Sequence, residues 1–395
     1  MNRSMRAELE KVIKSEIESV FGRRIVSSRD CIALSDEIYQ RTQNQLNPNT
    51  LRRFFGLVKA SYPASNATLN ILSKYCGFTS TEDIYQIKQK ETEEKPEVVE
   101  HKSLLYYLIS LFQDAPVSGK CDKTFLSLVK HTIKFLEFNP ALTDKFQGLV
   151  AKTKNGQDFY FEQFVNIDKL NSYFDNGLRY YMNEKPTPEA KLLVNAIQVY
   201  KYWLKDNTKK TKEFGEQIQD RSLIAGSSFY ISSRYYAALL FHAHVSGYPV
   251  EEILIDIYKL YSTFTETHRN NEALLYFEYV LSEALVLTGH YNDALYYLGQ
   301  FQKKEQFSDS PKYTVSGENV KLLKAIAHFK TGNIQLADTI FNDIKPSGFL
   351  FILKNFSGIL YMYLATELKR KNIRYNESFH SLIHETGFLR FRSGI

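Results

Sequence analysis

The chain has 395 residues, of which 44% are hydrophobic and 14% aromatic, and it contains only 10 Pro and 18 Gly. It can therefore bury a large core, and its few helix breakers and long amphipathic runs favour an all-α protein with room for two domains. Three widely separated cysteines, with no closely spaced pair, argue against a disulfide framework and a structural zinc site.

The cysteines and the N-terminal segment also bear on cellular location. Unpaired cysteines suit a reducing compartment. The first 21 residues are too charged for a signal peptide. No run approaches the roughly 18 apolar residues that a membrane helix needs. We therefore expect a cytoplasmic protein with no membrane partner.

The net charge of +6 is unevenly distributed. Residues 1–90 hold 14 Lys or Arg and 9 Asp or Glu, whereas the remainder holds 36 and 35. A small basic part beside a neutral body indicates a polyanionic partner for the basic part. The alternative is ordinary fluctuation, because a surplus of five charges on 90 residues is common.

Four amphipathic helical segments follow one another in the basic part. The first covers 3–21, and the second runs from Ser28 or Asp30 to about Thr42. Asn47-Pro48 starts a third that we expect to reach about Lys59. The fourth covers 67–75, and Thr79 or Ser80 would cap a last helix ending near Lys90. The inner face of the second segment is expected to hold Ile32, Leu34, Ile38 and Tyr39.

Part of this region carries a family pattern. Ser35 to Tyr39 fits the first helix of a helix-turn-helix motif, 47–55 its second, and Thr68-Leu69-Asn70-Ile71-Leu72-Ser73-Lys74-Tyr75-Cys76-Gly77-Phe78 the helix that follows. In these segments the chain resembles the phage-repressor (Cro-like) helix-turn-helix family. The resemblance implies a DNA-binding domain at 1–90, with the second helix of the motif in the major groove.

The resemblance also implies DNA-contacting side chains. Asn49 would pair with adenine edges, and Arg52 or Arg53 with guanine or phosphate. Phosphate contacts are expected at Lys59, Arg41, Arg23 and Arg24. The alternative is that Arg52 and Arg53 form the solvated face of a small helical domain, whose Phe54-Phe55 pair contacts protein instead of DNA.

Residues 91–100 are charged, contain Pro96 and lack aromatics, which predicts a linker. From 101 to 395 the pattern is helix after helix, joined by short connections. The region 139–167 is less regular. The predicted helices cover 102–113, 123–138, 168–182, 188–206, 228–246, 250–265, 270–288, 291–304, 317–331, 333–344 and 348–371.

An internal repeat is visible within these helices. Leu287 to Ala294 aligns with Lys330 to Ala337, and Gly289 and Gly332 stand 43 residues apart. The segment resembles the tetratricopeptide repeat, over roughly 228–371. The resemblance implies an α-solenoid of helical hairpins, with an inner surface that binds a peptide or protein ligand. Residues proposed for this surface are Tyr235, Tyr279, Asn292 and Lys321, although aromatic residues at such positions also serve as inter-helix core.

No enzyme motif is present. Phosphate-binding Gly-rich loops, HExxH and GxSxG are absent, and we expect no catalytic residue, no cofactor and no metal. We therefore expect a DNA-binding transcription regulator whose helical-repeat body senses a ligand or forms a homodimer. The alternative is a non-enzymatic protein-interaction scaffold whose N-terminal domain docks protein, and a role in phage defence is compatible with both.

Overall fold

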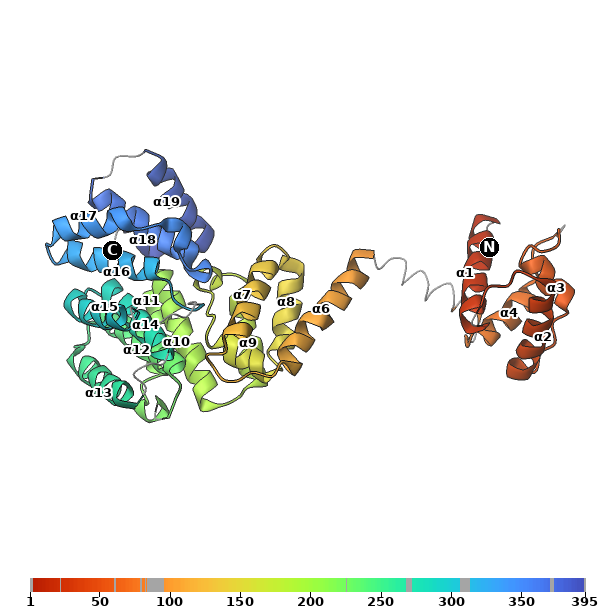
Figure 1. Cartoon of the computed structure of the whole chain (residues 1–395), viewed down its shortest axis with the longest axis horizontal. Helices are drawn as coiled ribbons and strands as arrows, with labels where there is room; N and C mark the ends of the chain where they lie inside the picture. The colour runs from red at the N-terminus through yellow and green to blue at the C-terminus, as the bar shows by residue number, and fades with distance from the viewer. Residues whose placement is uncertain are drawn as a thin grey trace. The chain divides into compact units, whose positions relative to one another are not determined.

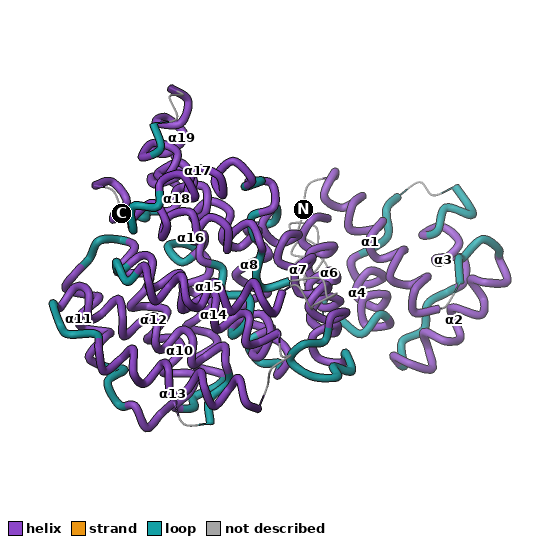
Figure 2. Tube along the Cα trace, turned by 60° about the vertical axis from the view of Figure 1, so that its left-hand side comes forward, coloured by secondary structure: helices purple, strands orange, loops and turns teal. Residues whose placement is uncertain are grey.

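The computed structural model describes residues 3–21, 23–59, 62–78, 80, 81, 83, 96–224, 226–267, 272–305, 313–369 and 373–393. Within them the chain is all-α and contains no strand (Figures 1 and 2). It divides into two compact units, Met1–Ser103 and Leu104–Ile395, here called the head unit and the body. The predicted linker at 91–100 adjoins this division. Its residues 91–95 lie outside the described part, and a helix begins at Pro96.

The head unit is built from α1 (Arg3–Phe21), α2 (Ser28–Thr42), α3 (Pro48–Phe54) and α4 (Asn66–Tyr75). α2 packs against α3 and α4, and α1 packs against α4. Their apolar faces form one core, which includes Ile13, Leu34, Leu51 and Leu72. Cys31 also belongs to this core, and burial raises the pKa of its thiol.

Local hydrogen bonds determine where these helices begin. Ser27 and Asp30 form a reciprocal capping box at the start of α2. The side chain of Asn47 accepts from the Asn49 backbone N–H at 2.8 Å, which starts α3. Ser80 and Asp83 exchange capping bonds in the same way. The rest of the helix predicted to end near Lys90 lies outside the described residues.

Two details of the head unit differ from expectation. α3 ends at Phe54, five residues before the predicted end, because Gly56 has a φ of 76° and the Leu57 N–H turns back to the Arg52 carbonyl at 2.8 Å. The inner face of α2 is also rotated from the predicted one. Ile32 and Tyr39 are 45% and 50% exposed, and their places in the core are taken by Cys31 and Ser35.

The described part of the body consists mainly of helices. Short 3-10 turns and the π-helical segment Gly156–Phe161 interrupt the longer helices. The α-helices are α6 (Pro96–Asp114), which crosses the division between the units, α7 (Lys123–Glu137), α8 (Pro140–Val150), α9 (Tyr173–Glu184), α10 (Pro188–Leu204), α11 (Thr208–Glu216), α12 (Phe229–Ser246), α13 (Glu251–Thr267), α14 (Glu272–Leu287), α15 (Tyr291–Glu305), α16 (Gly317–Lys330), α17 (Ile334–Asp343), α18 (Lys354–Glu367) and α19 (Ile373–Thr386).

Two helical hairpins occupy the segment where the internal repeat lies. α14 packs on α15, and α16 packs on α17. Gly289 and Gly332 separate the partners with φ values of 88° and 83°, which only glycine adopts without strain. Ala294 and Ala337 are completely buried, so each second helix approaches its partner closely.

The middle of the body is formed by α10, α12 and α14, which lie side by side (Figures 1 and 2). Every side chain from Tyr230 to Ala243 of α12 is buried, and so is every side chain from Leu274 to Leu287 of α14. These two helices therefore have no solvent-facing side along most of their length.

The C-terminal part of the body packs back on Asp168 and on the end of α10. Asp168 accepts backbone N–H groups of Asn355 and Phe356 at 2.7 and 2.9 Å. Arg390 Nε donates to the carbonyl oxygen of Trp203 at 2.8 Å, and the guanidinium lies 4.4 Å from the centroid of its ring. In a linear solenoid each repeat touches only its neighbours. This body is instead closed by contacts between segments that are far apart in sequence.

Candidate nucleic-acid interface

The short helix α3 is held in place by its apolar side and by the turn before it. Leu51 and Phe54 are buried in the head core. Ser35 Oγ donates to the Leu46 carbonyl at 2.5 Å, which fixes the turn against α2. With its inner face anchored in this way, α3 presents its polar residues Asn49 and Arg53 to solvent.

Asn49 and Arg52 interact with each other. Arg52 Nη1 donates to Asn49 Oδ1 at 2.8 Å. Arg52 is only half-buried, and Asn49 is exposed. An adenine contact through both atoms of the Asn49 amide would have to replace this hydrogen bond.

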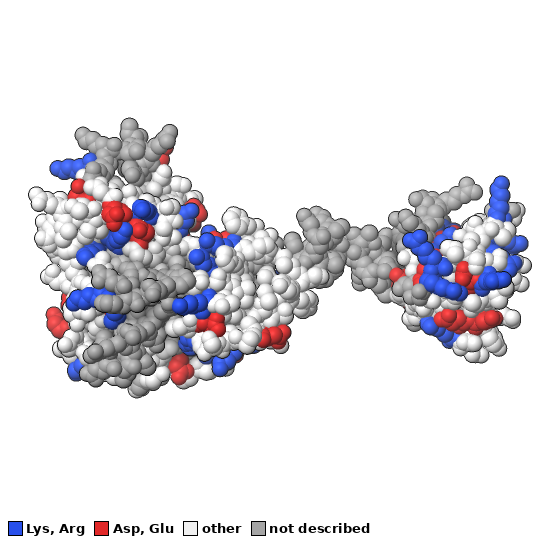
Figure 3. Space-filling model, viewed as in Figure 1, with Lys and Arg blue, Asp and Glu red and all other residues white. Residues whose placement is uncertain are grey.

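Three of the predicted contact residues are exposed cations for which the described residues supply no acidic partner. Within the described residues, no carboxylate lies within ion-pair distance of Arg53, Lys59 or Arg24. An unpaired surface cation keeps its full charge available to an anionic partner. Figure 3 shows Lys and Arg side chains gathered over the head unit, with a band of acidic side chains beside them.

The other two predicted phosphate contacts are already paired. Arg41 Nη2 lies 2.8 Å from Glu37 Oε1, and its guanidinium lies over the Tyr75 ring. Arg23 Nη2 lies 3.0 Å from Asp30 Oδ1. Both arginines are exposed, but their neighbouring carboxylates neutralise much of the charge that a phosphate would meet.

A cleft of about 730 Å³ opens between α1, α3 and the segment leading into α4, and we call it the head cleft. Its lining combines Arg53 and Lys59 with Lys14 of α1, a residue that the sequence pattern does not indicate. Lys14 is half-buried, and its ammonium lies 5.2 Å from the centroid of the Phe54 ring. No local pattern identifies Lys14, because its neighbours in the cleft come from elsewhere in the chain.

The residues proposed for a ligand groove in the body do not share one kind of surroundings, since two are buried and two lie nearer the surface. Tyr235 and Tyr279 are 0% and 3% exposed, and the Tyr279 hydroxyl donates to Glu283 at 2.9 Å. Both belong to the core and not to an open groove, because α12 and α14 are covered on all sides. Asn292 is exposed at the start of α15, and Lys321 pairs with Asp343 at 2.6 Å.

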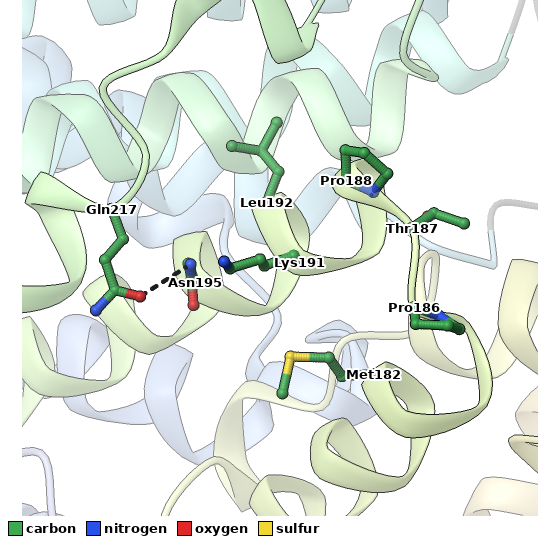
Figure 4. Close-up of a pocket in the computed structure, with 8 residues that line it drawn as sticks. All are labelled: Met182, Pro186, Thr187, Pro188, Lys191, Leu192, Asn195 and Gln217. Carbon is green, nitrogen blue, oxygen red and sulfur yellow. Dashed lines mark hydrogen bonds between the residues drawn. The ribbon is translucent and has the colours of Figure 1, made fainter.

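The body nevertheless contains an open cleft of about 480 Å³ beside the start of α10 (Figure 4). Met182 and Leu192 supply apolar surface, and Lys191 supplies a cation. At one end, Asn195 Nδ2 donates to Gln217 Oε1 at 3.3 Å. A cleft with an apolar wall and an amide pair can hold a small organic group or a peptide segment.

Other findings concern metals, membranes and relatives. Among the described residues, no three His, Cys, Asp or Glu side chains come together as a metal site requires. In the same part of the chain, no helix is both long and apolar enough to cross a membrane. The chain matches no model of a known protein family, no curated protein and no solved structure.

Proposed function

We propose that the chain is a DNA-binding transcription regulator whose head unit contacts DNA through α3. The observation that carries the proposal is the pair of exposed cations Arg53 and Lys59, which lie on one cleft and have no carboxylate partner in the described part of the chain. Cations in this state release counterions from DNA when they bind phosphate, which supplies most of a non-specific affinity. Asn49 and Arg52, on the same short helix, would supply contacts to bases.

In this proposal the body senses a ligand or joins two copies of the chain. Support for ligand binding comes from the cleft beside α10, which combines the apolar side chains of Met182 and Leu192 with the amides of Asn195 and Gln217. A peptide or protein segment is the partner that suits this chemistry, because backbone groups pair readily with side-chain amides.

Arg41 has a carboxylate partner and Arg53 has none among the described residues, and this difference gives a direct test of the DNA contact. Binding of the full chain to a labelled duplex is measured by fluorescence anisotropy at low and moderate salt. We expect Arg53→Ala to weaken binding by about tenfold, as loss of a 1–3 kcal/mol contact implies. Arg41→Ala should have a smaller effect, because Arg41 is already paired with Glu37. Equal effects of the two substitutions, or no binding at low salt, would contradict the proposal.

A second function, protein docking by the head unit, is favoured by one observation. Leu57, Val58 and Tyr62 are 37%, 48% and 85% exposed just after α3. Exposed apolar side chains grouped in one segment are typical of protein-binding surfaces. In that case the chain is an interaction scaffold, and Val58→Asp should abolish binding to its partner while Arg53→Ala leaves it unchanged.

A further inference from the structure

The head cleft has the size of a ligand site and extends from α3, the helix that the family pattern identifies, to α1. Its volume is about 730 Å³, and ligand pockets typically span roughly 300 to 1,000 Å³. One wall belongs to α1, which a helix-turn-helix motif uses only as support. The cleft therefore adds a first-helix residue, Lys14, to the surface around α3.

The charges on the cleft are unbalanced. Lys14, Arg53 and Lys59 face it, and within the described residues none of them has a carboxylate within ion-pair distance. Among the described lining residues Glu10 is the one acidic residue, and its Oε1 lies 4.0 Å from Arg6 Nε. Like charges gathered around one concave surface repel each other, and a bound anion removes this repulsion.

Two side-chain contacts fix the positions of the cleft walls. The Lys14 ammonium lies above the Phe54 ring, so it is held against α3 instead of extending freely into solvent. Arg6 Nη2 donates to the carbonyl oxygen of Ala64, which ties α1 to the segment that forms the far wall. The cleft is thus bounded by elements that are fastened to each other.

We propose that the head cleft binds a phosphate group between Lys14 and Arg53. A guanidinium offers two parallel N–H donors that match phosphate oxygens, and an ammonium adds a compact charge from the opposite wall. The phosphate can belong to the backbone of duplex DNA, in which case the inference rests on the proposed function, or to a free nucleotide. Both sources present the same group to the cleft.

The experiment uses the full chain and two probes, a labelled DNA duplex and adenosine monophosphate. Lys14→Ala is compared with Lys74→Ala, which removes the same charge from an exposed position on α4 outside the cleft. We expect Lys14→Ala to weaken binding of at least one probe by about tenfold. For DNA, the slope of log affinity against log salt should fall by about 0.9. The affinity of Lys74→Ala for each probe should stay within about twofold of the wild-type affinity.

Lys14→Arg distinguishes loss of charge from loss of folding, because it keeps the cation and should restore most of the affinity. If DNA binds but Lys14→Ala behaves like Lys74→Ala with both probes, the cleft proposal is overturned and the proposed function stands. If only the nucleotide binds, and Lys14→Ala weakens it, the cleft stands and the proposed function fails. Binding of neither probe overturns both.

Discussion

A buried carboxylate fastens three connecting segments of the body, and its removal gives a quantitative test of the structure. Glu162 is 1% exposed and accepts from Lys185 Nζ at 2.6 Å, Lys120 Nζ at 3.2 Å and the Tyr181 hydroxyl at 3.0 Å. Glu162→Gln removes the charge but keeps the shape of the side chain. Removing one partner of a buried ion pair typically costs about 3–5 kcal/mol.

Two features make the loss of stability expected for Glu162→Gln smaller than that range. Lys120 and Lys185 are 39% and 25% exposed, so water can solvate their ammonium groups in the variant. Asp158 also remains 3.9 and 3.8 Å from them. We therefore expect Glu162→Gln to lower the free energy of unfolding by about 2–3 kcal/mol at pH 7.

The single tryptophan, Trp203, is 2% exposed within the body, so its fluorescence during urea denaturation of the full chain reports unfolding of this unit. The matched control is Glu213→Gln. Glu213 pairs with Lys210 at 2.9 Å, with side chains 45% and 41% exposed. Glu213→Gln should lower the free energy of unfolding by no more than about 0.5 kcal/mol. Similar values for the two variants would refute the structural role of Glu162.

The effect of Glu162→Gln should also depend on pH. Burial alone would raise the pKa of Glu162, but the charges and hydrogen bonds of Lys120 and Lys185 outweigh it and lower the pKa below the ordinary value of 4.5. The stabilisation is therefore complete above pH 4.5 and is lost as the pH falls through the lowered pKa. The stability difference between wild type and variant should shrink in acid.

Three further predictions use the same fluorescence measurement. Gly215→Ala should lower the free energy of unfolding by about 1–3 kcal/mol, because a Cβ at Gly215 would lie 2.2 Å from Cδ2 of His242. A Cβ at Gly299 would meet no atom within 4 Å, so Gly299→Ala should stabilise α15 by about 0.5–1 kcal/mol. Equal effects of the two substitutions would contradict the packing of α11 on α12. Arg390→Ala should lower the free energy of unfolding by about 2 kcal/mol, because it removes the charged hydrogen bond that holds the C-terminal segment to α10. An unchanged urea midpoint would argue against the closed body. Burial raises the pKa of Asp168 to about 6 from 3.8, so its contribution to stability is present below about pH 4 and is lost as the pH rises through 6. From pH 7 to about pH 4.5 the wild type should therefore gain about 2 kcal/mol of stability relative to Asp168→Asn, and a pH-independent difference would contradict this.

Most helices follow from the periodicity of their apolar residues, and the exceptions have physical reasons. α11 was not predicted, because the sequence TKKTKEFGE has little apolar pattern and is positioned by packing on α10 and α12. The irregular region 139–167 contains α8 and then the π-helical segment Gly156–Phe161, whose wider turns do not follow a period of 3.6 residues.

The candidate site was predictable only where its pattern is local. Asn49 and Arg53 could be assigned to the exposed side of α3 because Leu51 and Phe54 mark its buried side. The pairing of Arg41 with Glu37 follows helix spacing and was available from the sequence. Lys14 could not be found in this way, because only tertiary packing brings α1 to the head cleft.

The interior of the body was harder to predict for a different reason. A helix that is apolar all round gives no signal for which neighbour covers which side. Tyr235 and Tyr279 were therefore assigned to a groove although both are buried. The contacts that close the body, such as Asp168 with the start of α18, join segments whose proximity no local pattern reveals.

In the proposed function, DNA phosphate binds those cations of the head unit that have no carboxylate partner among the described residues. The most direct measurement is the affinity of the full chain for duplex DNA over a series of salt concentrations, compared between the wild type and Arg53→Ala. We predict a linear decrease of log affinity with log salt for the wild type, and a slope smaller by about 0.9 for the variant. Absence of DNA binding at low salt, or identical slopes for the two proteins, would contradict the claim.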